Sequence, residues 1–225
     1  MAEGSLTDHA FIDRYRQCFD RTWRDDSAVG AVRFVVLDCK TTGLNPAVDS
    51  IITIGAIGVQ DGAILIEDSF DALIRIERNT SAVTVHGITR DESRNGLDEP
   101  QALGKFLDYL KDGVIVGHHI GHDIASLDAG YERHWGFRLA NRWLDTMYLS
   151  AHLAKAGAFS SRHTAREFTL DVLCDVFGIE PHGRHTASGD AFLTAQVFLR
   201  LCLFARRNGR TTLGQICEPF QFEEA

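Results

Sequence analysis

Three aspartates stand at points of the chain where carboxylates could meet in the folded protein. Asp38 ends a short apolar run typical of a buried strand, and Asp123 follows the next such run and opens a helical pattern. Asp190 lies one turn into a long apolar helical stretch, where a carboxylate needs a partner or a cation. Ligand sites in α/β sheets lie at the carboxyl ends of strands, although a strand-ending aspartate is also a common turn former. If the three carboxylates converge, they form an oxygen-rich site suited to Mg²⁺ or Mn²⁺.

His185 precedes Asp190 by five residues, in the sequence His-Thr-Ala-Ser-Gly-Asp. The helical pattern begins after the histidine, so we expect His185 on a loop at the mouth of the same site. A neutral imidazole there could take a proton from a metal-bound water, which is general-base chemistry. A single histidine is also often only a polar surface residue. Its spacing from Asp190 is what favours the functional interpretation.

Hydrophobic patterns predict the strands and helices that must position these groups. Short apolar or alternating runs predict strands, the second and third joined by an Asp-Gly turn, at residues 32–37, 50–59, 63–76 and 114–116. Apolar residues at helical spacing predict helices at 103–110, 123–135, 145–155, 169–177 and 187–207. A hairpin followed by alternating strands and helices predicts an α/β protein, with a mixed sheet and helices on its faces.

The first part of the chain differs from the rest. Phe11, Tyr15, Phe19 and Trp23 recur at four-residue spacing among charged residues, which predicts an amphipathic helix over about residues 7–23. We therefore expect residues 1–30 to form a helical extension. Residues 31–225 would form the main domain, because a chain of 225 residues is long enough for one large core.

Composition excludes several classes of protein. Apolar residues make up 44% and charged residues 24%, which is ordinary for a globular chain. The sequence has no run of about 18 apolar residues and no apolar signal region at its start, so we expect no membrane span and no secretion. Five cysteines without a Cys-x-x-Cys pair predict reduced thiols in the cytoplasm. The net charge of −8 argues against a surface that coats nucleic acid broadly, but not against a nuclease with an acidic cleft.

Three motifs occur in an order that is typical of one family. They are Asp-Cys-Lys-Thr-Thr-Gly-Leu at 38–44, Gly-His-His-Ile-Gly-His-Asp at 117–123, and the complete His-x-Ala-x-x-Asp motif at 185–190. Supporting pieces include His-Gly-Ile-Thr at 86–89 and Leu-Asp-Thr at 144–146. With these motifs the chain resembles the DnaQ-like 3′–5′ exonucleases of the DEDDh type, and within them the proofreading epsilon subunit of bacterial DNA polymerase III.

The resemblance implies a ribonuclease H-like fold, with a mixed five-stranded sheet and helices on both faces. It also implies a metal-dependent 3′–5′ exonuclease, a phosphodiester hydrolase. Asp38 and Asp190 would bind up to two Mg²⁺ or Mn²⁺ ions, and Asp123 would support them through water. His185 would be the general base. Two such ions would stabilise the attacking and leaving oxygens of the scissile phosphate.

The resemblance also implies a substrate and partners. The pocket for the 3′-terminal nucleotide would be lined by Thr41, Thr42, Gly43 and Leu44, with His86 beside it. The ligand would be the 3′ end of single-stranded DNA or RNA. A homodimer or a polymerase-associated partner would fit this family, in the cytoplasm and without a membrane.

One departure from the family pattern bears directly on metal binding. The first motif of the family has a metal-binding glutamate where this chain has Lys40, so a ligand is replaced by a cation. Two interpretations follow. In the first, the chain is a working exonuclease with weakened metal binding, with one ion instead of two. In the second, it is a pseudo-exonuclease in which the Lys40 ammonium takes the place of a metal, pairs with Asp38 and Asp190, and leaves a nucleic-acid-binding or partner module.

Overall fold

A computed structural model describes residues 10–76, 88–159 and 167–217 of the chain. Its strands are β1 (Phe34–Thr41), β2 (Ile51–Gln60), β3 (Ala63–Leu73), β4 (Val114–Gly117) and β5 (Trp143–Asp145). They form one five-stranded sheet in the order β3-β2-β1-β4-β5. Strand β1 runs antiparallel to β2 and parallel to β4, so the sheet is mixed, as predicted.

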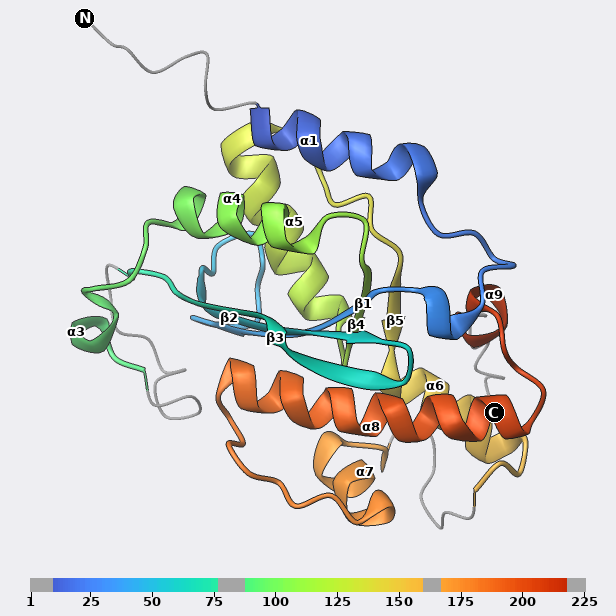
Figure 1. The fold of residues 1–225 in the computed structure, drawn as a ribbon. Helices are drawn as coiled ribbons and strands as arrows, with labels where there is room; N and C mark the ends of the chain where they lie inside the picture. Colours follow the sequence, from blue (N-terminus) through green and yellow to red (C-terminus); the bar gives the residue numbers. More distant parts are fainter. Residues whose placement is uncertain (1–9, 77–87, 160–166, 218–225) are drawn as a thin grey trace, which may run out of the picture.

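Helices cover both faces of this sheet (Figure 1). One face carries α1 (Ala10–Cys18), α4 (Glu99–Leu110) and α5 (Gly121–Trp135). The other face carries α6 (Thr146–Lys155), α7 (Leu170–Phe177) and the long helix α8 (Ala187–Arg207). The short helices are η1 (Phe19–Arg21), η2 (Val29–Ala31), α3 (Arg90–Ser93) and α9 (Leu213–Ile216). The predicted layers are therefore present.

Strand β1 shows how the sequence pattern builds two cores. Phe34 and Val36 belong to the cluster on the α8 side, and the rings of Phe34 and Phe198 are 4.8 Å apart. Val35 and Leu37 belong to the cluster under α4 and α5. All four β1 residues are almost fully buried, and each such side chain contributes about 1.5–3 kcal/mol of hydrophobic free energy. The sheet centre is thus apolar on both faces, which explains why β1 reads as a continuous apolar run.

The N-terminal helix packs on the face of α4 and α5. Tyr15 is buried, and its hydroxyl donates to the side-chain oxygen of Asn141 at 2.5 Å and accepts from the backbone of Ala140 at 2.7 Å. Arg14 bonds Asp108 of α4 at 2.8 Å. The described helix ends at Cys18 and continues as a 3-10 turn to Arg21. The division of the chain at residue 30 stays a prediction.

Several element boundaries differ from the sequence prediction. Strand β1 extends to Thr41, because its polar end still pairs with β2. The sequence pattern does not predict the strand at 143–145. Its three residues pair with β4 and are followed directly by α6. Strand β3 ends at Leu73 rather than at residue 76, and α4 begins at Glu99, ahead of Pro100. Proline at the start of a helix leaves no extra hydrogen bond unmade, which agrees with its position here.

Among the described helices, α8 is long and apolar enough to cross a membrane by length and composition alone. Half of its apolar stretch is buried inside the molecule, where the helix covers the sheet (Figure 1). The core helix of a globular domain passes the same test, so this feature is weak evidence of a membrane span.

Candidate active site

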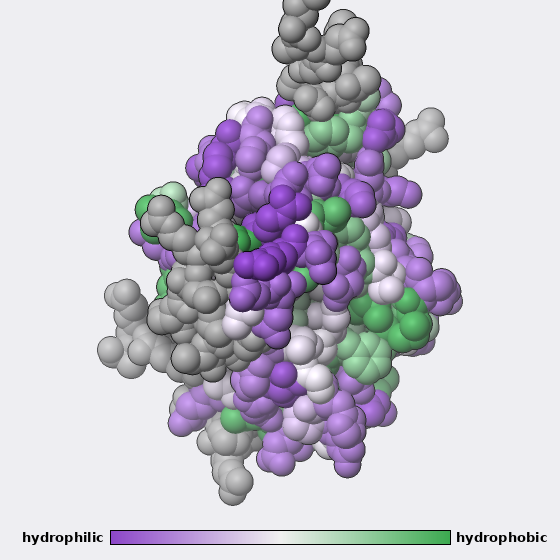
Figure 2. Space-filling model, turned by 90° about the vertical axis from the view of Figure 1, so that its left-hand side faces the viewer, coloured by the Kyte–Doolittle hydropathy of each residue, from purple (hydrophilic) through white to green (hydrophobic). Residues whose placement is uncertain are grey.

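The polar end of β1 faces the beginning of α8. Side chains alternate along a strand, so Asp38 and Lys40 continue the side on which Phe34 and Val36 pack under α8. The face on the left of Figure 1, where α8 begins, is mainly hydrophilic among its described side chains (Figure 2). The alternation of β1 thus brings an aspartate and a lysine to a polar edge of the molecule, beside the first turn of α8.

A glycine in the neighbouring strand lets α8 approach this edge. Gly55 of β2 stands opposite Asp38 in the sheet. A Cβ atom at Gly55 would lie 2.3 Å from the backbone nitrogen of Ser188, so only a hydrogen fits there. Glycine inside a strand often marks such a close backbone approach. The contact places Asp190, two residues further along α8, within reach of β1.

Lys40 connects Asp38 of β1 with Asp190 of α8. Its Nζ atom lies 2.5 Å from Oδ2 of Asp190, as a hydrogen bond, and 2.9 Å from Oδ2 of Asp38, as an ion pair. The side chain of Asp190 is only 4% exposed and that of Lys40 15%. Burial alone would lower the pKa of Lys40, but the charges of Asp38 and Asp190 outweigh it and raise that pKa. The ammonium group is therefore held charged between the two carboxylates.

Arg184 occupies the other side of Asp190. Its guanidinium bonds Oδ1 of Asp190 through Nη1, and it binds Asp171 of α7 through Nε at 2.6 Å and Nη2 at 3.0 Å. The bond to Asp171 is the main reason why the pKa of Arg184 is raised, and Arg184 in turn lowers the pKa of Asp171. Both oxygens of Asp190 thus face a cationic side chain.

Asp123 supports the same edge from the opposite face of the sheet. It lies in the first turn of α5, is buried, and accepts a hydrogen bond of 2.6 Å from the backbone N–H of Cys39. Burial raises the pKa of Asp123 well above its usual range, and the negative charge of Asp38 raises it further. Burial also raises the pKa of Asp38 to about 6, against the opposing charge of Lys40. The carboxylates of β1 and α5 therefore interact electrostatically.

His185 lies in the turn before α8, as expected from the sequence. It has a left-handed backbone conformation with φ of 68°, which is uncommon for a residue with a side chain. Its backbone N–H donates to Oδ1 of Asp190 at 3.2 Å, while the residue itself is exposed. Thr186 caps α8 by accepting from the N–H of Gly189 at 3.1 Å. The histidine is thus tethered to Asp190 through its backbone, with its ring on the exposed side of the turn.

The predicted substrate residues form the turn that follows β1. Thr42 donates from its hydroxyl to Oδ1 of Asp49 at 2.9 Å, and Thr41 donates to the backbone oxygen of Gly43 at 2.7 Å. A Cβ atom at Gly43 would lie 2.5 Å from the Asp49 carboxylate, so the turn closes around a glycine. Leu44 is 88% exposed. The turn therefore holds a leucine side chain out in solvent beside the acidic edge.

The structure describes one of two histidines that belong to the sequence motifs. His122 of α5 lies within hydrogen-bond distance of Thr41, with 3.2 Å between Nε2 and Oγ1. This contact links the second motif to the first. His86, predicted to flank the nucleotide pocket, lies outside the described residues.

The roles of three residues at the site were predicted from the sequence only in part or not at all. Arg184 was visible only as a basic residue before the third motif, and nothing in the sequence pointed to its bonds with Asp190 and Asp171. Gly55 carried a usable signal, since it interrupts a run of four β-branched residues, Ile51 to Ile54. Asp145 caps α6 and also accepts from the backbone N–H groups of residues 119 and 120, at 3.2 and 3.1 Å. It therefore holds the loop that carries the second motif.

A divalent ion at this site needs carboxylate oxygens that are free to coordinate it. Both oxygens of Asp190 are engaged by Lys40 and Arg184, Oδ2 of Asp38 faces Lys40, and Asp123 bonds the backbone. Among the described residues, no three His, Cys, Asp or Glu side chains are grouped so as to hold a metal ion. In this arrangement the residues do not fit a divalent cation, and the cause is the pair of cationic side chains on Asp190.

Comparison with known proteins decides the family. The sequence model of a family described as Exonuclease, RNase_T, matches residues 35–198, which run from β1 into α8. The chain belongs to this exonuclease family. The predicted DnaQ-like resemblance is thereby confirmed. The family is divalent-metal dependent. The replacement of an acidic ligand by Lys40 stays a prediction.

Two relatives of this chain are much longer proteins. DNA polymerase III PolC-type of Thermotoga maritima is 36% identical over 200 residues, covering 87% of this chain but 14% of that protein. A DNA polymerase III subunit epsilon-like protein of Rhodobacter capsulatus is 32% identical over 196 residues, covering 85% of this chain and 27% of the relative. This chain thus spans between a seventh and about a quarter of these two relatives.

Solved structures confirm the fold. E. coli exonuclease I in complex with a dA16 oligonucleotide matches with a TM-score of 0.69 at 18% identity, covering 78% of this chain and 42% of that one. The zinc-bound form of the same enzyme with single-stranded DNA matches with a TM-score of 0.68 at 19% identity, covering 80% and 42%. The ribonuclease H-like α/β architecture predicted from the motifs is therefore correct.

Proposed function

We propose that this chain is a 3′–5′ exonuclease that removes nucleotides from the 3′ end of single-stranded nucleic acid. The observation that carries the proposal is the exonuclease family match over residues 35–198, which includes all three motif aspartates. In support, Asp38 and Asp190 meet at one polar edge of the sheet through Lys40, and Asp123 approaches from the other face. Carboxylates gathered at a sheet edge are typical of a phosphoryl-transfer site in this fold.

The turn after β1 supports binding of the 3′-terminal nucleotide. The N–H of Thr42 already donates to the backbone oxygen of Ser50 at 2.9 Å, which leaves the N–H groups of Gly43 and Leu44 for sugar and phosphate oxygens. The exposed side chain of Leu44 could wedge against a base. Exonuclease I, which shares the fold, is seen in complex with single-stranded oligonucleotides. We carry this substrate class over to the present chain, with DNA as the first substrate to test because its named relatives are DNA polymerase proteins.

His185 is the proposed general base. Its turn is fixed to Asp190 by a backbone hydrogen bond, and its ring stands on the exposed side, where a water near the scissile phosphate would lie. A histidine at this place can accept the proton of the attacking water near neutral pH. The backbone hydrogen bond of 3.2 Å holds the turn that carries this histidine next to Asp190.

A second candidate function has a specific observation in its favour. Lys40 and Arg184 already neutralise Asp190, so the positive charge that a divalent ion supplies elsewhere in the family is partly present in the side chains. On this basis the chain would bind 3′ ends without cutting them. In the proposed exonuclease, Asp38, Asp123 and Asp190 would hold the divalent metal, and Lys40 would have to leave Asp38 and Asp190 first.

A 5′-labelled single-stranded oligonucleotide separates the two functions. Stepwise shortening from the 3′ end with Mn²⁺ or Mg²⁺, abolished by EDTA and by Asp190→Asn, supports the exonuclease. A DNA strand and an RNA strand of the same sequence test the substrate. Binding without shortening, with a 3′-phosphate-blocked strand as control, supports the second function. If no binding occurs even at low salt, where phosphate contacts are strongest, both proposals fail.

We further propose a cytoplasmic chain that works with a polymerase, since named relatives are PolC-type and epsilon-like proteins of DNA polymerase III. The predicted homodimer stays a prediction.

A further inference from the structure

A pocket lies at the far end of α8, away from the acidic edge. Asp190 is in the first turn of α8 and Arg206 in the last, so the two are about 24 Å apart along the helix at 1.5 Å per residue. The pocket has a volume of about 600 Å³ and lies between α8, the turn after β2, η2 and α9. It is separate from the site described above, and none of the three motifs contributes to it.

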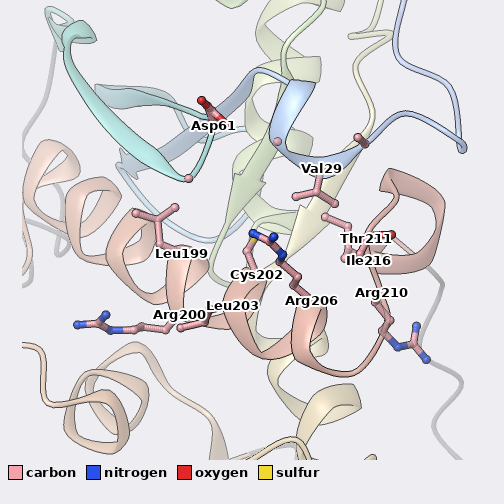
Figure 3. A pocket seen from close by; sticks show the side chains of 13 residues that line it. Val29, Asp61, Leu199, Arg200, Cys202, Leu203, Arg206, Arg210, Thr211 and Ile216 are labelled. Carbon is pink, nitrogen blue, oxygen red and sulfur yellow. The ribbon is translucent and has the colours of Figure 1, made fainter.

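The lining of this pocket combines an apolar floor with positive charge. Its apolar side chains include Val29, Leu199, Leu203 and Ile216, and Leu203 is 43% exposed. Figure 3 shows the guanidinium of Arg206 within the pocket, below Val29. A pocket of this kind fits an occupant that offers a large apolar side chain next to a carboxylate.

Two arginines of the pocket lining have no ion-pair partner among the residues that the structure describes. They are Arg200 and Arg206, whereas Arg14 of α1 pairs with Asp108 and Arg133 of α5 pairs with Glu99. Asp61 also lines the pocket, and Figure 3 shows it at the opposite rim from Arg200. Arg200 and Arg206 of α8 thus line a partly apolar pocket, and the Asp61 carboxylate at its rim forms no ion pair with either of them.

The sequence supplies a complementary segment next to this pocket. Residues 218–225 read Glu-Pro-Phe-Gln-Phe-Glu-Glu-Ala, with two phenylalanines, three glutamates and no basic residue. They lie outside the described residues. The segment follows Cys217 directly, and Ile216, one residue earlier, is part of the pocket lining. Such a short tether gives the segment an effective concentration of about millimolar at the pocket.

We propose that the pocket of Arg206 is a binding site for an acidic aromatic peptide, and that its occupant is the segment 218–225 of the same chain. The glutamates pair with Arg206 and Arg200, and a phenylalanine covers Leu199 and Leu203. The inference is independent of the exonuclease activity, because it uses no residue of the acidic edge. Its consequence is that the segment competes with any acidic aromatic peptide that reaches this surface.

The test uses the full chain and a fluorescein-labelled, end-blocked peptide with the sequence of residues 218–225. The first variant, called the silent segment, carries Glu218→Gln, Phe220→Ser, Phe222→Ser, Glu223→Gln and Glu224→Gln. We expect fluorescence anisotropy to show the peptide binding to the silent-segment chain at least tenfold more tightly than to the wild type, since the wild-type segment competes. Adding Arg206→Glu, or the milder Arg206→Gln, should abolish this binding.

Arg207→Glu is the matched control, because Arg207 is the exposed neighbour of Arg206 at the same helix end but does not line the pocket. Arg207→Glu changes the charge at the C-terminus of α8 in the same way as Arg206→Glu, so it controls for that effect. Equal loss of binding in both variants, or no binding to the silent-segment chain, overturns the site. Equal binding to wild-type and silent-segment chains overturns occupancy by residues 218–225. An oligonucleotide that displaces the peptide through Arg206 shows a nucleic-acid surface instead, and also contradicts the proposal.

Discussion

The Nζ atom of Lys40 lies 2.5 Å from Oδ2 of Asp190, where the end of β1 meets the first turn of α8. The other oxygen of the same carboxylate bonds Arg184. A buried aspartate is therefore held by two cationic side chains. Buried charges of this kind persist only with partners, so each member of the group depends on the others.

Removing the Lys40 charge should destabilise the fold. In Lys40→Met the stem of the side chain remains, but Asp38 and Asp190 lose the cation between them. Breaking a buried ion pair from one side costs about 3–5 kcal/mol, and we expect the lower end because Lys40 keeps some exposure. Urea denaturation at pH 7 measures the change in the free energy of unfolding. Lys105→Met, at an exposed position of α4, is the control, with an expected change of about 0.5 kcal/mol or less. Similar small losses in both variants would contradict the buried ion pair.

Gly55→Ala should disturb the approach of α8 to the sheet. The added Cβ would lie 2.3 Å from the backbone of Ser188, so the helix start must shift, and we expect a loss of about 1–3 kcal/mol. Gly104→Ala on α4 has no neighbour within 4 Å of its new Cβ and should be stabilising by up to about 1 kcal/mol. Denaturation midpoints of the two variants should therefore move in opposite directions. A Gly55→Ala protein as stable as the wild type would show that α8 is not in close contact there.

These two sites show what the sequence could and could not predict. The continuous apolar run of β1, the hairpin that follows it and the order of the motifs predicted the sheet, the helix layers and the approach of β1 to the last long helix. The same reasoning raised the pairing of Lys40 with Asp38 and Asp190 as one of two interpretations. The pairing of Arg184 with Asp171 could not be predicted. Asp171 is 13 residues away on α7, and the contact depends on how α7 packs. Strand β5 was missed because three residues carry too little pattern.

The stability of the protein should depend on the protonation of His118. Burial lowers the pKa of this histidine to about 3, from an ordinary value near 6.5. The unfolded chain therefore takes up a proton on this residue as the pH falls through about 6.5, while the folded chain does not until about 3. The contribution of neutral His118 to the free energy of unfolding is therefore fully present above about pH 6.5. It is lost as the pH falls from about 6.5 to about 3. In His118→Gln, unfolding curves between pH 7 and 4 should show a shallower loss of stability, by up to a few kcal/mol. Parallel curves for the two proteins would contradict the buried neutral histidine.

The proposed role of His185 predicts a separation of binding from turnover. His185→Ala should lower the rate of 3′ shortening by about 10²–10⁴-fold and leave oligonucleotide affinity nearly unchanged, because a general base acts in the chemical step. His182→Ala changes another histidine of the same turn, with its side chain 87% exposed, and should leave the rate unchanged. A rate that falls only in proportion to weaker binding would place His185 in contact with substrate instead.

Titration of Mn²⁺ into the wild type and into Lys40→Glu tests the central claim, that the Lys40 ammonium holds the place of a divalent cation on Asp38 and Asp190. Removing the cation and adding a carboxylate both favour a divalent ion. Isothermal calorimetry should show binding at least tenfold tighter in Lys40→Glu, with faster 3′ shortening and lower stability in the absence of metal, because three carboxylates then crowd one edge. Equal Mn²⁺ affinity and equal metal-free stability in the two proteins would contradict the claim.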